Sequence, residues 1–170
     1  MLSKIDSDFE QNPRRQQEVR LRPYADEIYR FVFGADINIM RFSNKIILDK
    51  EFAIDVQLTL RTGQILLGQE KFLSSIYSKY NSLTVEYKQN ENEQGDWFKL
   101  APQIYFTGYE CDKGFYPWVL VNWANLVIAT LRGEVQWSDN KNKDGYAQAS
   151  FRYININEIP LECIIARSSI

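Results

Sequence analysis

The stretch Ile54–Phe72, IDVQLTLRTGQILLGQEKF, alternates apolar and polar residues on both sides of a central glycine. In its first arm, apolar side chains recur at every second position: Ile54, Val56, Leu58 and Leu60. Because side chains alternate between the two faces of a strand, this period predicts a half-buried strand. Arg61-Thr62-Gly63 supplies a tight reversal in which Gly63 can adopt a positive φ. With the second extended run, Gln64–Phe72, it predicts a β-hairpin.

The hairpin carries polar side chains that suit a cation held against a phosphate. Gln69 and Lys71 should share one face of the second arm and Glu70 the other, and Asp55 can reach the first face, depending on register. Mg²⁺ prefers oxygen ligands and keeps several waters. A lysine beside such an ion can orient a water and offset charge at phosphorus. The alternative is that these are ordinary solvated residues on an exposed sheet face.

Asp55, a hairpin turn and Gln69-Glu70-Lys71 together resemble the PD-(D/E)XK nuclease superfamily. Its pattern is an Asp opening one strand and a Glu-x-Lys on the next, and with flanking elements the match covers about the central half of the chain. Gln69 departs from that pattern, which has Asp or Glu at this place. The resemblance implies Mg²⁺, or Mn²⁺ in its place, on Asp55 and Gln69. After a local bulge, Glu70 could replace Gln69 as ligand.

The resemblance also implies roles for Lys71 and for an acid on the first helix. Lys71 would position the attacking water. An acidic residue on the first helix often joins the metal site in this superfamily, which makes Glu27 a candidate and Asp26 its rival. Either acid could instead serve only as favourable charge near a helix start. Glu86 is a further acid that could face the same site.

The composition of the chain limits the kinds of catalytic and metal-binding site that it can form. The chain has 170 residues, of which 45% are hydrophobic and 25% charged, so we expect one globular domain. The formal net charge of −2 gives no global basic field, although a local basic groove is still possible. Histidine is absent from the sequence, which excludes Ser-His-Asp and Cys-His catalysis and histidine metal sites within this chain.

The cysteines and the N-terminus predict a cytoplasmic protein. Cys111 and Cys163 lie far apart with no CxxC spacing, which indicates neither a zinc site nor a disulfide framework. The first residues lack the apolar run of an export signal, and no stretch approaches the roughly 20 apolar residues of a membrane span. We expect no membrane partner.

The remaining pattern predicts an α+β domain with a mixed, mostly antiparallel central sheet and a helix on each side. Residues 1–22 read as a polar leader, loose or helical, whose arginines could touch phosphate. The helices are expected at Tyr24–Phe33, opened by Pro23, and at Trp123–Leu131, with Asn122 as N-cap. Beyond the hairpin, strands or extended pieces are expected at 36–42, 45–49, 83–87, 97–100, 103–109, 118–122, 147–156 and 163–166.

Polar loops are expected at 89–96 and 137–145; the alternative for the second is that Lys141 and Lys143 contact DNA backbone. A short helix or irregular turn is expected at 72–80, with Ser74, Ser75, Lys79 and Tyr80 as possible phosphate contacts.

By resemblance, the sequence predicts a restriction-endonuclease-like core and a metal-dependent DNA endonuclease. The catalytic set would be Glu27, Asp55, Gln69 and Lys71. Sequence-specific cutting of a symmetric duplex would need two active sites, so a homo-oligomer is expected. The alternative is a catalytically inactive protein of the same fold that binds nucleic acid or another protein, which the Gln69 departure would suit.

Overall fold

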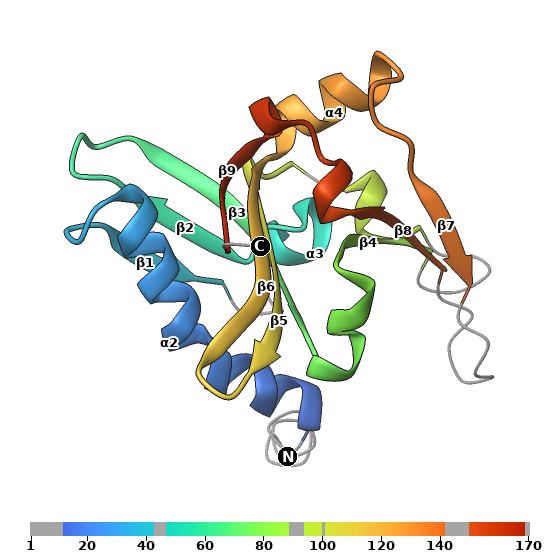
Figure 1. The fold of residues 1–170 in the computed structure, drawn as a ribbon. Coiled ribbons are helices and arrows are strands. Elements are labelled where there is room, and N and C mark those ends of the chain that lie inside the picture. The colour runs from blue at the N-terminus through green and yellow to red at the C-terminus, as the bar shows by residue number, and fades with distance from the viewer. Residues whose placement is uncertain (1–11, 43–46, 89–93, 100, 142–149, 169–170) are drawn as a thin grey trace, which may run out of the picture.

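The computed structural model describes residues 12–42, 47–88, 94–99, 101–141 and 150–168. They form a six-stranded and a three-stranded β-sheet; one face of the larger sheet is covered by a helix, and the other face by the three-stranded sheet and a second helix (Figure 1). The architecture is therefore mixed α+β with a mixed central sheet, as the sequence predicted.

The larger sheet has six strands in the order β1-β2-β3-β5-β6-β9. Their bounds are β1 Asn38–Arg41, β2 Val56–Thr59, β3 Ile65–Leu73, β5 Ile104–Cys111, β6 Gly114–Asn122 and β9 Ile164–Arg167. The β2–β3 hairpin is antiparallel, with Val56 opposite Gly68. Gly63 takes φ +83° in its turn, which confirms the predicted hairpin. β3 and β5 pair in parallel, whereas the other neighbours are antiparallel.

The segment between β3 and β5 crosses over one face of this sheet, because parallel neighbours cannot be joined by a tight turn. It contains the 3₁₀ helix η1 (Ser75–Tyr80), strand β4 (Ser82–Lys88) and the short 3₁₀ turn η2 (Asp96–Phe98). β4 pairs with β8 (Ser150–Asn155), which pairs with β7 (Ser138–Lys141), in a three-stranded antiparallel sheet. The sequence predicted one sheet; long-range pairing of β4 with β8 makes the second.

Two apolar clusters hold the layers together. On one face, helix α2 (Pro13–Phe33) buries Leu21, Ala25 and Tyr29 against strand residues such as Phe106 and Leu120. On the other face, helix α4 (Trp123–Leu131) and the three-stranded sheet pack against β5 and β6. Of the helices in the described part of the chain, none combines the length and apolar character that a membrane crossing requires.

Helix α2 begins earlier than the sequence predicted, at Pro13 rather than at Tyr24. Asn12 is its N-cap, with its Oδ1 accepting a hydrogen bond from the Arg14 N–H at 3.0 Å. Pro23 therefore lies inside the helix instead of opening it. Pro23 and Val19, whose carbonyl loses its helical donor, are both exposed, so water can replace the missing bond.

Helix α2 is attached to the large sheet by polar contacts at two places. In its first half, Gln17 Nε2 donates to Glu110 of β5 at 2.5 Å, and Arg20 pairs with the same carboxylate. In its second half, Asp26 forms an ion pair with Arg41 of β1 at 2.6 Å. The predicted leader is thus partly a docked helix.

Other elements correct or confirm the expectations. Of the extended piece expected at 45–49, residues 45 and 46 lie outside the described part, and the remainder belongs to helix α3 (Ile47–Phe52), since so short an apolar run cannot distinguish a strand from a helix. Of the strand expected at 97–100, residue 100 is likewise not described, and Trp97 and Phe98 belong to η2, because Trp97 turns into an aromatic cluster with Trp123 and Trp137. β7 takes part of the predicted loop at 137–145, and Lys143 lies outside the described residues. Helix α4 and its N-cap Asn122, whose Oδ1 accepts from Asn125 N–H at 3.0 Å, are confirmed.

Gly68 lies where β2, β3 and β5 meet, and it tests this packing. A Cβ on Gly68 would lie 2.9 Å from Val56 Cγ1 and 3.0 Å from Ile104 Cγ1, which is too close. We expect Gly68→Ala to lower the free energy of unfolding by about 1–3 kcal/mol in urea titrations, the usual cost of overpacking.

A double-mutant cycle separates this clash from other effects of the added methyl group. Val56→Ala removes the nearer clashing atom, so the cost of Gly68→Ala should fall by at least about 0.5 kcal/mol in the Val56→Ala background. An equal cost in both backgrounds would contradict the packing described here.

Candidate functional site

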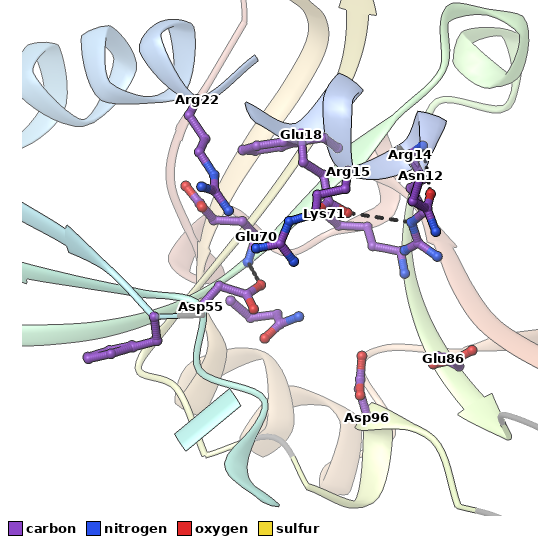
Figure 2. A pocket seen from close by; sticks show the side chains of 13 residues that line it. Asn12, Arg14, Arg15, Glu18, Arg22, Asp55, Glu70, Lys71, Glu86 and Asp96 are labelled. Atoms are coloured by element: carbon purple, nitrogen blue, oxygen red, sulfur yellow. Dashed lines mark hydrogen bonds and ion pairs between the residues drawn. The ribbon is translucent and has the colours of Figure 1, made fainter. Parts of the chain in front are cut away.

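A polar cleft of about 330 Å³ opens between the first half of α2, strand β3 and the crossover (Figure 2). Its lining includes Asn12, Arg14, Arg15, Glu18, Arg22, Phe42, Asp55, Gln69, Glu70, Lys71, Phe72, Glu86 and Asp96. Three members of the predicted catalytic set, Asp55, Gln69 and Lys71, therefore line one cavity, together with Glu70 and Glu86, which were also singled out from sequence. A lining dominated by charged and amide groups suits a charged ligand rather than an apolar one.

The hairpin brings these three residues together. Asp55 directly precedes β2, and its N–H donates to the Gly68 carbonyl of β3 at 2.9 Å. In return, the Glu70 N–H donates to Asp55 Oδ2 at 2.9 Å, which turns the carboxylate toward β3. Gln69 and Lys71 lie two positions apart on β3 and so share the face that lines the cleft.

Gln69 presents an oxygen that lacks a protein partner in the described part of the structure. The residue is 8% exposed, and its buried Oε1 accepts no hydrogen bond from any described group. An unsatisfied buried acceptor costs roughly 1–3 kcal/mol, so its presence beside a polar cleft points to a ligand.

The donor set fits a hard cation. The Asp55 carboxylate and the Gln69 amide oxygen are ligands that Mg²⁺ accepts, and Mg²⁺ commonly completes its shell with waters and substrate phosphate. Over the described ranges, no three acidic or cysteine side chains lie close enough together to hold a metal alone. The protein would therefore contribute few ligands, leaving several positions open.

Lys71 lies half-buried at the centre of the charges in the cleft. Burial lowers the pKa of its ammonium from the ordinary value of 10.5, and Arg14 lowers it further. The negative charges of Asp96, Glu86 and Asp55 oppose this lowering of the pKa. Burial in turn raises the pKa of Glu86, against the effect of Lys71. The pKa of the Lys71 ammonium therefore lies closer to neutral pH than that of a solvated lysine.

The Glu70 carboxylate is turned away from Gln69 and Lys71. It accepts hydrogen bonds from Arg41 Nε at 2.8 Å, from Arg41 Nη2 at 2.9 Å and from Tyr29 Oη at 3.1 Å. β3 pairs with β5 in unbroken register from Gly68 to Leu73, so the bulge that would have turned Glu70 inward does not form. Glu70 contributes its backbone N–H to the site instead.

Glu27 is not brought to the cleft either. It is exposed on the second half of α2, whereas the cleft is lined by the helix's first turns. Asp26, its rival, pairs with Arg41. The α2 acid that does line the cleft is Glu18, which the sequence reading placed in the polar leader.

The three arginines of the cleft lie on its α2 side, with Glu18 among them, and Glu86 and Asp96 lie on the other side (Figure 2). We call Arg14, Arg15 and Arg22 of α2 the arginine wall, and Glu86 of β4 with Asp96 of η2 the acidic wall. Residues 14, 18 and 22 are four apart and so share a helix face, and Arg14 Nε pairs with Glu18 Oε1 at 3.5 Å. The sequence contains an indication that the helix begins before Pro23, because Leu21, Ala25 and Tyr29 form an apolar stripe that continues through this proline.

The lowered pKa of Lys71 predicts a specific pH dependence. Since the unfolded chain binds the Lys71 proton more tightly than the folded chain, folding becomes more favourable as pH rises from the lowered pKa toward 10.5. Lys71→Met lacks this titration. We therefore expect Lys71→Met to be more stable than the parent near pH 7, by about 0.5–2 kcal/mol, with the gap closing toward pH 10.5.

Urea unfolding between pH 7 and 10.5 measures the difference, with Lys113→Met as the matched control. Lys113 is exposed in the β5–β6 turn, so its replacement controls for the loss of a lysine side chain outside the cleft. A Lys71→Met gap that stays constant over this range would contradict the described burial.

Comparisons with family models, with curated proteins and with solved structures returned no match to this chain. The proposals that follow therefore depend on the geometry and charges of the cleft.

Proposed function

We propose that this protein is a metal-dependent nuclease that hydrolyses phosphodiester bonds in DNA. The observation that carries the proposal is the meeting of Asp55, Gln69 and Lys71 in one cleft, with Gln69 Oε1 buried and lacking a partner among the described groups. A carboxylate and an amide oxygen can hold a metal ion, and an amine beside them can offset charge on a phosphate, which suits metal-assisted phosphoryl hydrolysis.

Each residue of the site has a role in this chemistry. Mg²⁺ or Mn²⁺ would be held by the Asp55 carboxylate and the Gln69 amide oxygen, and when bound it would activate a water and offset phosphate charge. The Glu70 N–H fixes the Asp55 carboxylate. Lys71 donates hydrogen bonds to the attacking water or to a phosphate oxygen. The arginine wall receives flanking phosphates.

The proposal extends to the fold. Helix α2 precedes the hairpin, and the hairpin supplies the site from the start of one strand and the middle of the next, which supports a restriction-endonuclease-like core. We place the protein in the cytoplasm, with DNA as its partner. Cutting both strands of a symmetric duplex would require a second copy of the chain.

Nuclease assays test the proposal directly. With plasmid and labelled oligonucleotides in Mg²⁺ or Mn²⁺, we expect cleavage that EDTA abolishes. Lys71→Ala and Asp55→Asn should each slow it at least about 100-fold, since each removes a group that stabilises developing charge. Lys113→Ala, on the exposed β5–β6 turn, is the control and should cleave normally. Metal-dependent cleavage that survives both site substitutions would exclude this site.

The second candidate is a binding protein with the same fold and no chemistry, which the amide at Gln69 favours. Metal binding separates the two. A site that holds Mn²⁺ stabilises the folded state by about 2.7 kcal/mol at 100 times Kd, which is readily seen as a higher Tm. We expect this shift in the parent and in Gln64→Leu, which alters an exposed residue near the hairpin turn, and its loss in Gln69→Leu. If the Tm of the parent chain does not change with Mn²⁺, the result favours the second candidate, a binding protein without catalysis.

A further inference from the structure

We infer that the cleft binds a single strand of DNA, with bases stacked on two tyrosines of η1 at its edge. The inference rests on the proposed function, because it names the substrate class of the same site. It draws on three features: the depth of the reacting groups, the arginine wall and the exposed face of η1.

The groups that would act on phosphate are recessed. Gln69 is 8% exposed and Lys71 is half-buried, with α2 on one side and β4 with η2 on the other (Figure 2). The phosphates of a straight duplex lie on the outside of a wide convex cylinder. A single strand can bend its backbone into a cleft of about 330 Å³, whereas a duplex cannot enter without being opened.

The arginine wall can follow a backbone. Arg14 and Arg22 are eight residues apart on α2, which corresponds to about 12 Å of helix. That length lets the guanidinium groups meet successive phosphates on either side of Lys71. Arginine binds phosphate oxygens through paired N–H donors, so this side of the cleft fixes the path of the strand.

The 3₁₀ helix η1 presents an unpartnered aromatic face. Three residues per turn place Tyr77 and Tyr80 on the same side, and they are 50% and 58% exposed. None of its residues is buried, and Lys79 Nζ lies 5.1 Å from the centre of the Tyr80 ring. Exposed aromatics beside a cation are typical of surfaces on which unpaired bases stack.

η1 and the start of α2 lie at the same end of the molecule (Figure 1). Both are attached to the end of β5, from its two faces: Ser82, two residues beyond η1, donates its N–H to Tyr109 Oη at 3.0 Å, and the adjacent Glu110 accepts a hydrogen bond from Gln17 of α2. A strand that runs along α2 can therefore leave the cleft toward η1. An apolar protein partner could also cover the tyrosines, but the nearby arginine wall and Lys79 complement a polyanion.

Binding in EDTA tests the inference without any chemistry. Fluorescence anisotropy would compare one labelled oligonucleotide with the duplex of the same sequence. We expect the single strand to bind at least tenfold more tightly. The double variant Tyr77→Ala/Tyr80→Ala should weaken that binding by roughly fivefold or more for each tyrosine, at unchanged Tm. Phe31→Ala, which alters an 85% exposed aromatic on the second half of α2, should bind like the parent.

The arginine wall is tested in the same way with Arg14→Gln/Arg22→Gln. We expect loss of most single-strand affinity, while Arg30→Gln, an exposed arginine in the last turn of the same helix, retains it. Equal affinity for duplex and single strand, or full binding by the tyrosine variant, would overturn the inference and leave metal-dependent cleavage untouched. Tight single-strand binding that depends on both sets, without cleavage in Mg²⁺ or Mn²⁺, would support the inference and overturn the proposed nuclease.

Discussion

The parallel pairing of β3 with β5 is the constraint on which the rest of the structure depends. An antiparallel neighbour could have followed β3 through a tight turn, leaving the face of Gln69 and Lys71 open to water. A parallel neighbour forces the chain to return along the sheet, and it does so as η1, β4 and η2. That return path brings Glu86 and Asp96 opposite Lys71 and changes a sheet surface into a cleft.

Alternate residues of strand β3 project to opposite faces of the large sheet. Gln69 and Lys71 face the cleft, while Glu70 between them joins Arg41 and Tyr29 on the α2 face. A buried ion pair adds little net stability, because its desolvation offsets the attraction. Its value here is positional: the same residue anchors α2 with its side chain and orients Asp55 with its N–H. The docking of the second half of α2 and the orientation of the Asp55 carboxylate therefore depend on the same residue.

The sequence pattern predicted the features that depend on residues close together in the chain. Alternation and Gly63 were enough for the β2–β3 hairpin, and hence for the meeting of Asp55, Gln69 and Lys71. Features that depend on contacts between distant parts of the chain were not predicted. Pro23 was interpreted as a helix start, so Glu18 was missed and Glu27 was favoured. Asp96 was interpreted as part of a solvated loop, whereas its segment folds back on the end of β4, where the Gly95 N–H donates to the Tyr87 carbonyl at 3.0 Å, and Asp96 lines the cleft.

The two attachments of α2 differ in their exposure to solvent, and this has a consequence for ionic strength. The clamp on Glu110 uses Arg20, whose side chain is 63% exposed, whereas in the second attachment Arg41 and Asp26 are 13% and 23% exposed. Near 1 M salt the Debye length shrinks to about 3 Å, so the exposed clamp is screened while the buried pair is not. Pro23, between them, lacks the N–H that would couple the two halves fully. Concentrated salt should therefore loosen the N-terminal half of the helix, with its arginines, and leave the C-terminal half in place.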